Sequence, residues 1–426
     1  MSGKNAVWTD RRNITLLNLE HALKRERGLK DRFMSKGKIA IIGIGEVPTG
    51  TYPQRTHWDI MYDTCMEAVR DSGLHKNDIE ATAIVEPQAQ PQITGELAFG
   101  KLPEELGLKG VKDSVLCNAG GATTSSCIRL AEYWITNGMA KAVLVPHVTV
   151  HSTIPLKDQI NFFAKAGVDL QWEYPYGTTY NIIMGLSANQ YMHQSGCTPE
   201  EMASVVTALR SWASRDPHSI FYKKEVPSAE KVLASDLLNT PLHKRESNVL
   251  GDGGCAMVVV SAKDAEKMKR PAAYKLGESA RYFSATCVVR DMEQVKEGWR
   301  VTAKEAMAQA GIKKEDVSLW NVYVAYPLAH PIMAEALEVA PPGQAGKYFL
   351  QGRMSFGGDI PWSTIGDAPG RGHTGSGVSA ATYVETARQL MGKAGERQVK
   401  DCKYVYQNSN GGSGFNIIAT IWGKEI

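Results

Sequence analysis

The alternation of apolar and polar positions predicts strands and helices in regular succession. An almost unbroken apolar run over residues 38–45 is typical of a buried strand. Residues 58–72 have the spacing of an amphipathic helix, which Gly73 ends, and residues 78–85 are predicted as the next strand. This alternation favours the α/β class, with mostly parallel sheets covered by helices.

Two stretches of the chain recur later in the same order. Residues 68–79 (AVRDSGLHKNDI) match residues 306–317 (AMAQAGIKKEDV) position by position, and residues 252–260 resemble residues 410–418. Chance similarity between helix–strand units explains one such match easily, but two less well. We therefore predict that the chain contains two duplicated halves.

The predicted organisation has an arm, two halves and one insertion. The basic, polar arm spans residues 1–37 and is either a surface terminus or an arm that embraces another subunit. The first half spans residues 38–275 and carries an insertion at about 153–245, rich in aromatic residues and with two predicted helices. This insertion either shapes a substrate tunnel or forms the surface of a dimer. Residues 276–426 form the second half.

Composition limits the classes of function. With 426 residues, 43% of them hydrophobic, the chain can bury a large core. Its 48 basic and 45 acidic residues nearly cancel, which leaves no electrostatic footprint for nucleic acid. The seven cysteines form no CxxC pair, so we expect no metal site and a reducing compartment. Without an 18-residue apolar run or a signal peptide, we expect a soluble, cytoplasmic protein that does not enter a membrane.

Several motifs occur together in an order that resembles the thiolase superfamily, specifically the sterol-carrier-protein-type thiolases. They are the strand-to-helix stretch 116–126 (LCNAGGATTSS), residues 191–198 (YMHQSGCT), residues 211–217 (SWASRDP), Pro241-Leu242 followed by Asp252-Gly253-Gly254, and residues 366–377 (GDAPGRGHTGSG). The resemblance covers about residues 38–426. It implies a five-layer αβαβα fold built from two duplicated halves plus a loop domain, which is the insertion defined above.

The same resemblance implies chemistry and partners. Members act on coenzyme A thioesters as substrates and hold no covalently bound cofactor. They form homodimers, and relatives of this type often work as hetero-oligomers with a small separate protein that carries an OB-fold and a zinc ribbon.

Gly121 stands where a thiolase carries its nucleophilic cysteine, counting back from Gly138 at the end of the following helix. Glycine cannot be acylated, but its backbone N–H at a helix start can donate to a thioester oxygen. The alternative is that this register is wrong and that Cys117 or Cys127 is the nucleophile.

Two side chains are candidates for proton transfer. His373 matches the histidine that acts in the family as a base or an oxyanion donor, although Thr374 replaces the following proline. Tyr323 aligns with the "NEAF" or "HDAF" segment and resembles the tyrosine of the steroid side-chain CoA aldolases, which also lack the cysteine. The competing interpretations are a structural histidine and a core tyrosine on a strand.

Five further residues complete the predicted site. The backbone of Gly411 and Gly412 is expected to contribute an oxyanion contact. Ser409 falls where thiolases carry a second cysteine and is predicted as a turn residue rather than a catalyst. Asp367 and Arg371 flank the glycine-rich loop before His373 and are predicted to hold a polar substrate.

With both cysteines absent, the resemblance favours an acyl-CoA carbon–carbon lyase that cleaves a β-hydroxyacyl-CoA by a retro-aldol route, or condenses in reverse. Such a reaction needs a base and an oxyanion hole but no acyl-enzyme. Two alternatives stay open. One is a β-ketoacyl-CoA thiolase or acyltransferase with a relocated nucleophile, and the other is a non-catalytic subunit that binds acyl-CoA.

Overall fold

The computed structural model describes residues 37–86, 96–165, 168–283, 292–412 and 416–426. The chain divides into two units, residues 1–36 and residues 37–426. Residues 1–36 of the predicted arm therefore lie outside the described residues.

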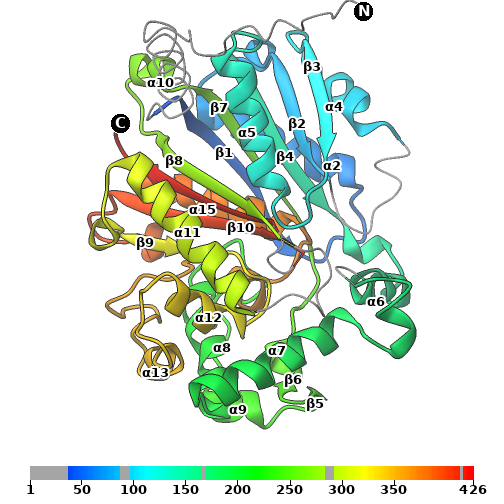
Figure 1. Ribbon diagram of the computed structural model, residues 1–426. Coiled ribbons are helices and arrows are strands. Elements are labelled where there is room, and N and C mark those ends of the chain that lie inside the picture. Colours follow the sequence, from blue (N-terminus) through cyan, green and yellow to red (C-terminus); the bar gives the residue numbers. More distant parts are fainter. Residues whose placement is uncertain (1–36, 87–95, 166–167, 284–291, 413–415) are drawn as a thin grey trace, which may run out of the picture. The chain divides into compact units, whose positions relative to one another are not determined.

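Nine strands form one mixed sheet in the order β3-β2-β4-β7-β1-β8-β11-β10-β9 (Figure 1). The strands are β1 (Ile39–Gly50), β2 (Ala81–Val85), β3 (Asp113–Cys117), β4 (Ala142–Thr149), β7 (Asp252–Ser261), β8 (Ala273–Tyr282), β9 (Leu319–Asn321), β10 (Tyr404–Gly411) and β11 (Asn416–Gly423). Outward from the central β1–β8 contact, the first half follows the order β1, β7, β4, β2 and β3, and the second half follows the order β8, β11, β10 and β9. In each half, the first strand in sequence therefore lies next to the last one, and the other strands lie beyond it. This symmetric order is the one that duplicated halves predict.

The prediction of mostly parallel pairing is wrong. Only β2–β3, β2–β4 and β9–β10 run parallel, and the remaining pairs of the nine-stranded sheet run antiparallel. At least one reversal is forced by connection length. β10 ends at Gly411 and β11 begins at Asn416, a link too short for the crossover that parallel neighbours need.

The first sequence repeat corresponds to equivalent elements. Helix α2 (His57–Ser72) is followed by a 3-10 turn and β2, as α11 (Met292–Ala310) is followed by a 3-10 turn and β9. The second repeat does not align in the same way. Residues 252–260 all lie in β7, whereas Asn410 and Gly411 end β10.

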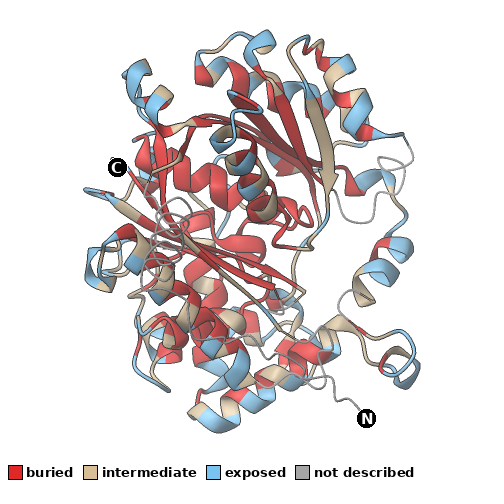
Figure 2. Cartoon of the chain, turned by 45° about the horizontal axis from the view of Figure 1, so that its top comes forward, coloured by how far each residue is buried: buried red, intermediate tan, exposed pale blue. Residues whose placement is uncertain are grey.

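Helices cover both faces of the sheet and also fill its centre. α2 packs on β1 and β7, and α11 packs on β8 and β11. Between the two halves lie α5 (Thr123–Thr136) and α15 (Gly377–Leu390), which contact strands of both halves. All 14 residues of α15 are buried, and buried residues concentrate in this central region (Figure 2). The resulting succession of helices, strands, helices, strands and helices has five layers.

Strand alternation assigns side chains to these layers. Ile39 and Ile41 of β1 belong to the core cluster that contains α5 and α15 residues, whereas Ala40 and Ile42 belong to the cluster under α2. Because successive strand residues face opposite sides, a buried strand between two helical layers must be apolar throughout. This explains the apolar run at residues 38–45.

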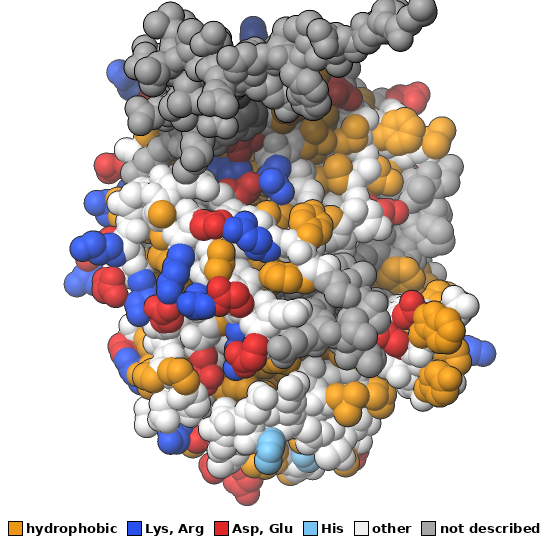
Figure 3. Space-filling model, viewed as in Figure 1, with side chains coloured by type: hydrophobic (Ala, Val, Ile, Leu, Met, Phe, Trp, Pro, Cys, Tyr) orange, Lys and Arg blue, Asp and Glu red, His pale blue; other side chains and the backbone are white. Residues whose placement is uncertain are grey.

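The loop domain lies between β4 and β7. Its elements are α6 (Leu156–Ala164), α7 (Tyr180–Ser195), α8 (Pro199–Ala213), α9 (Ala229–Leu233), β5 (Leu237–Asn239) and β6 (Leu242–His243). Thr198 caps α8 with a reciprocal bond to Glu201, and Pro199 occupies the first helical turn. Hydrophobic side chains gather on the surface at α6 (Figure 3), where Leu156 and Ile160 are exposed.

The remaining helices connect these parts. They are α4 (Ala98–Leu106), α10 (Ala262–Met268), α12 (Ala329–Ala336), α13 (Ala345–Leu350) and α14 (Asp367–Arg371), with short 3-10 turns η1 (Lys76–Asp78), η2 (His151–Thr153), η3 (Tyr174–Tyr176), η4 (Lys244–Glu246), η5 (Lys314–Asp316) and η6 (Gly395–Arg397).

Candidate functional site

Gly121 lies just before α5, in contact with Tyr323. A Cβ placed on Gly121 would lie 2.5 Å from Tyr323 Cε1, 3.1 Å from Tyr323 Oη and 2.3 Å from the carbonyl oxygen of Asn410. These distances are below or near the limit of van der Waals contact, so no side chain fits at position 121 beside this tyrosine. The Tyr323 ring therefore occupies the space that a side chain at position 121 would need.

The loop before α5 also packs on the β10–β11 turn. A Cβ on Gly411 would lie 2.5 Å from the carbonyl oxygen of Ala119, and one on Gly120 would lie 3.4 Å from the Gly412 nitrogen. Glycine permits this close approach, and Gly120 and Gly412 also have positive φ angles of 58° and 51°. The structure thus brings Gly121, Tyr323 and the Gly411–Gly412 turn together.

Tyr323 lies beyond the end of β9 rather than on a strand. Its N–H donates to Asn408 Oδ1 (3.1 Å), and its carbonyl oxygen accepts from Asn410 Nδ2 (2.7 Å). Two strand residues of β10 therefore hold its backbone. Burial, followed by the nearby Asp367 and Tyr180, raises the pKa of Tyr323 far above its usual range. The phenol is consequently neutral at physiological pH and can donate a proton.

Asp367 holds the backbone of the residue that follows Tyr323. Its Oδ2 accepts from the Val324 N–H (2.9 Å) and lies 3.2 Å from His330 Nε2. Trp362 Nε1 donates to His330 Nδ1 (3.0 Å), and because an indole N–H only donates, His330 carries its proton on Nε2 toward Asp367. Asp367 is fully buried, and its Oδ1 has no hydrogen-bond partner within the described part of the chain. Sequence reasoning missed His330, because its link to Asp367 exists only in three dimensions.

His373 is buried and fixed in one tautomer. The Gly375 N–H donates to His373 Nδ1 (3.1 Å), so the proton of the neutral ring is on Nε2. Burial, with a contribution from His151, lowers the pKa of His373 to about 4. At neutral pH the side chain is therefore a hydrogen-bond donor through Nε2, which suits an oxyanion contact rather than a base.

The two remaining predicted side chains have structural partners. Arg371 is buried in ion pairs with Glu46 and Asp216 (2.7 Å to Asp216 Oδ2), instead of lying open to a substrate. Ser409 is a buried residue of β10, not of a turn, and its hydroxyl lies 3.0 Å from that of Ser379 in α15. Neither contact was apparent from the sequence, because each joins distant segments.

Six cysteines lie in the described residues, all of them as free thiols, and Cys287 lies outside these residues. Cys127 is fully buried, and burial raises its pKa. Cys117, at the end of β3, is half-buried, and a hydrogen bond from Cys127 lowers its pKa. The three heavy atoms nearest to a Cβ at position 121 belong to Asn410 and Tyr323, and none is sulfur.

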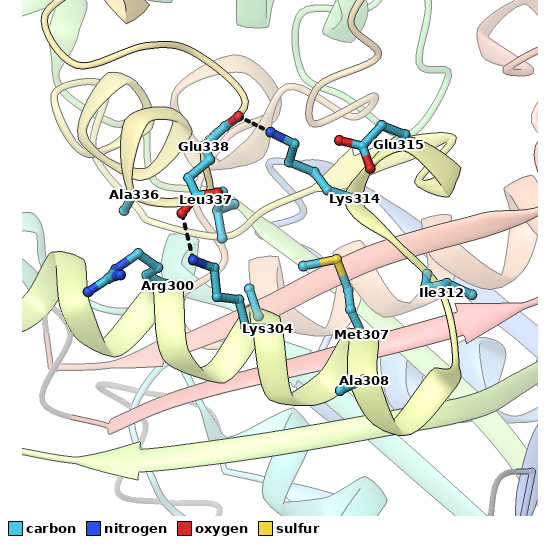
Figure 4. Close-up of a pocket in the computed structure, with 11 residues that line it drawn as sticks. Arg300, Lys304, Met307, Ala308, Ile312, Lys314, Glu315, Ala336, Leu337 and Glu338 are labelled. Atoms are coloured by element: carbon cyan, nitrogen blue, oxygen red, sulfur yellow. Dashed lines mark hydrogen bonds and ion pairs between the residues drawn. The ribbon is translucent and has the colours of Figure 1, made fainter.

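A pocket of about 330 Å³ lies elsewhere, between α11 and the segment after α12 (Figure 4). Its lysines are already paired, because Lys304 Nζ donates to Glu338 Oε1 (2.7 Å) and Lys314 Nζ donates to the Glu338 carbonyl oxygen (2.8 Å). None of the predicted site residues lines it.

Within the described residues, no three His, Cys, Asp or Glu side chains cluster as metal ligands would. No helix in the same part of the chain is both long and apolar enough to cross a membrane.

Comparison with known proteins identifies the architecture. Residues 283–424 match the family described as thiolase C-terminal domain-like. The chain has the thiolase fold and carries a thiolase C-terminal domain. The solved structure of an Ltp2-ChsH2(DUF35) aldolase superposes with a TM-score of 0.76 at 23% identity, covering 92% of this chain and 98% of that one.

Acyltransferases and lyases are both among the proteins similar to this chain. An acetyl-CoA acetyltransferase of Methanothermobacter thermautotrophicus is 24% identical, covering 88% of this chain and 97% of the relative. A 17-hydroxy-3-oxo-4-pregnene-20-carboxyl-CoA lyase of Mycobacterium tuberculosis is also 24% identical, covering 84% of this chain and 93% of the relative. Homologues of this thiolase-like chain therefore include acyltransferases and lyases that act on coenzyme A thioesters.

Proposed function

We propose that this protein cleaves the Cα–Cβ bond of a β-hydroxyacyl-CoA by a retro-aldol reaction, or forms it in reverse. The observation that carries the proposal is the contact between Tyr323 and Gly121, which leaves no room for a nucleophilic side chain at position 121. The similarity to a coenzyme A lyase and to an aldolase supports the same reaction type. A route without an acyl-enzyme needs only proton transfer and stabilisation of an enolate.

The groups at the site suit these steps. The thioester oxygen, which becomes the enolate oxygen, accepts from the Gly121 N–H at the start of α5 and from the backbone of Gly411 and Gly412. His373 adds a neutral Nε2–H donor. Tyr323, neutral because burial raises its pKa, protonates the α-carbon of the enolate. The products are a carbonyl compound and a shorter acyl-CoA.

A direct test uses purified protein and a β-hydroxyacyl-CoA without free coenzyme A. We expect release of an aldehyde or ketone together with a shorter acyl-CoA, detected by mass spectrometry. A strict requirement for added coenzyme A would contradict the proposal, because thiolysis consumes coenzyme A and retro-aldol cleavage does not.

A thiolase or acyltransferase reaction is the second candidate, favoured by the lowered pKa of Cys117. In that case iodoacetamide should inactivate the enzyme by modifying Cys117, and substrate should protect it. The lyase proposal predicts instead that Cys117→Ser keeps its activity, since a serine cannot replace a thiolate nucleophile but leaves β3 intact.

We also propose a homodimeric core and a separate small partner with an OB-fold and a zinc ribbon. The similarity to a structure named for a ChsH2(DUF35) component supports such a partner. Light scattering of the purified chain tests the dimer, and a monomeric mass with full activity would exclude the need for either assembly.

A further inference from the structure

Retro-aldol cleavage needs a group that accepts the β-hydroxyl proton, and the two predicted proton-transfer residues are poorly suited to this step. Tyr323 is a neutral phenol whose pKa is raised, so it holds its own proton. His373 carries its proton on Nε2, while its Nδ1 accepts from Gly375. A different side chain with a free lone pair is required.

His151 has such a lone pair. It begins η2 directly after β4 and is 2% exposed, and neither of its ring nitrogens has a hydrogen-bond partner among the residues that the structure describes. By contrast, the ring nitrogens of His147, also buried, lie near the Val85 carbonyl oxygen (3.2 Å) and the Thr149 hydroxyl (2.8 Å). Buried polar groups in folded proteins are normally hydrogen-bonded, so an unpaired buried imidazole is available to bond to a substrate.

The position of His151 places it beside the candidate site. The ring of Phe163 packs against both imidazoles, with centroid distances of 5.8 Å to His151 and 5.6 Å to His373. The backbone links the same groups, because Gly251 N–H donates to the His373 carbonyl oxygen (3.1 Å) and the next residue, Asp252, binds the Ser152 N–H (2.8 Å). His151 and His373 therefore flank one phenylalanine at the edge of the loop domain.

The charges around His151 allow it to gain a proton transiently. Burial lowers its pKa to about 4, so the ring is neutral at physiological pH and one nitrogen has a free lone pair. Asp252 is the acidic group that favours the protonated ring, and His147 and His373 are titratable neighbours that oppose it. The Asp252 carboxylate is itself held by Ser152 and the Tyr52 N–H.

We propose that His151 is the catalytic base that takes the β-hydroxyl proton of the substrate. The assignment rests on the proposed lyase function. As the proton moves to the free ring nitrogen, the O–H electron pair forms the carbonyl bond and the Cα–Cβ bond breaks. The electron pair of that bond enters the thioester enolate, which takes a proton from Tyr323 at the α-carbon. The proton on His151 then returns to Tyr323 through solvent, so that protons and electrons balance.

The test compares His151→Gln with wild type in the cleavage assay, using His193→Gln as a control at an exposed position of α7. We expect kcat to fall by about 10²–10⁴-fold in His151→Gln with KM changed only a few-fold, and no change in the control. We also expect His151→Ala to recover part of its rate when imidazole is added, a rescue that a purely structural histidine would not show. A kcat within a few-fold of wild type in His151→Gln would overturn the assignment.

A second measurement does not depend on turnover. Protein labelled with ¹⁵N-histidine is titrated with a non-cleavable thioether analogue of a β-hydroxyacyl-CoA, and the His151 ring resonances are assigned by their loss in His151→Gln. A shift of these resonances on binding supports contact with the hydroxyl group, and unchanged resonances in a saturated complex overturn it. Wild type that binds the analogue but cleaves no β-hydroxyacyl-CoA would overturn the lyase function, while the resonance shift would still decide whether His151 contacts the hydroxyl.

Discussion

The ring of Tyr323 packs against Gly121, with its Cε1 atom 2.5 Å from the position that a Cβ atom of residue 121 would occupy. The two residues are about 200 positions apart, and each explains the other. Glycine at position 121 makes room for the ring, and the ring excludes any larger residue. The pair therefore places a phenol, and no side chain of residue 121, at the start of α5.

Substitutions at Gly121 test this contact. We expect Gly121→Ala and Gly121→Cys to displace Tyr323 and to lower kcat by at least 10-fold, since the added carbon also meets the Asn410 carbonyl oxygen at 2.3 Å. Gly100→Ala is a matched control, because a Cβ there meets nothing within 4 Å and alanine favours the helix. Wild-type activity in Gly121→Ala, or thiolysis gained by Gly121→Cys alone, would contradict this view.

Removal of the Tyr323 hydroxyl tests proton transfer. Tyr323→Phe keeps the ring that packs on Gly121, so we expect an unchanged melting temperature but a loss in kcat on the order of 10²-fold or more. Tyr406→Phe is the control, because this buried hydroxyl of β10 has no hydrogen-bond partner among the described residues. Equal effects of the two substitutions on kcat would show that the Tyr323 hydroxyl has no special part in the reaction.

The carboxylate of Asp367 is expected to position the Tyr323 segment. Asp367→Ala leaves the buried Val324 N–H without its acceptor and removes the carboxylate that lies 3.2 Å from His330 Nε2, so we expect a loss of about 1–3 kcal/mol in unfolding free energy, measured by urea denaturation. Asp359→Asn, which breaks an exposed pair with Arg353, should cost about 1 kcal/mol or less.

The conservative variant Asp367→Asn separates charge from packing. It removes the negative charge that helps to raise the pKa of Tyr323, so any limb of the rate profile that reports the phenol should move to lower pH. An unchanged profile together with full activity would limit Asp367 to a passive structural contact.

Buried histidines should make the fold acid-sensitive. Burial lowers the pKa values of His147, His151 and His373 from 6.5 to about 4. Between these values the unfolded chain binds more protons than the folded one, so stability is lost as pH falls from about 6.5 toward 4. Each histidine can lower the free energy of unfolding by up to about 1.4 kcal/mol for each pH unit in this window.

Melting temperatures at pH 7.5 and pH 5 measure this effect, and we expect a clear fall at the lower pH. The carboxyl of Glu46 does not obscure it, because its pKa is held at about 2 despite burial, by Arg371 and other nearby cations. His147→Gln should make the dependence on pH shallower. Equal stability at both pH values would mean that these imidazoles are protonated in the folded protein.

Local patterns were sufficient for several elements. The helix predicted over residues 58–72 is found at His57–Ser72, because caps and amphipathic spacing act within a few residues. Strand directions were predicted wrongly, because the antiparallel pairing of β1 with β7 joins segments that are separated by three other strands and the loop domain.

In the candidate site, too, the sequence determined some features and the tertiary structure decided others. Sequence alone determined that a glycine stands at position 121 and that Tyr323, His373 and the Gly411–Gly412 pair are present, since motif order and spacing are properties of the chain itself. Only the tertiary structure decided that the tyrosine ring fills the space beside Gly121. It also decided that Arg371 forms ion pairs with buried carboxylates, and that the ring nitrogens of His151 have no hydrogen-bond partner among the described residues. Each of these features depends on contacts between segments far apart in the sequence. Burial there removes polar groups from water, and the neighbouring segments determine which hydrogen-bond or ion-pair partners replace it.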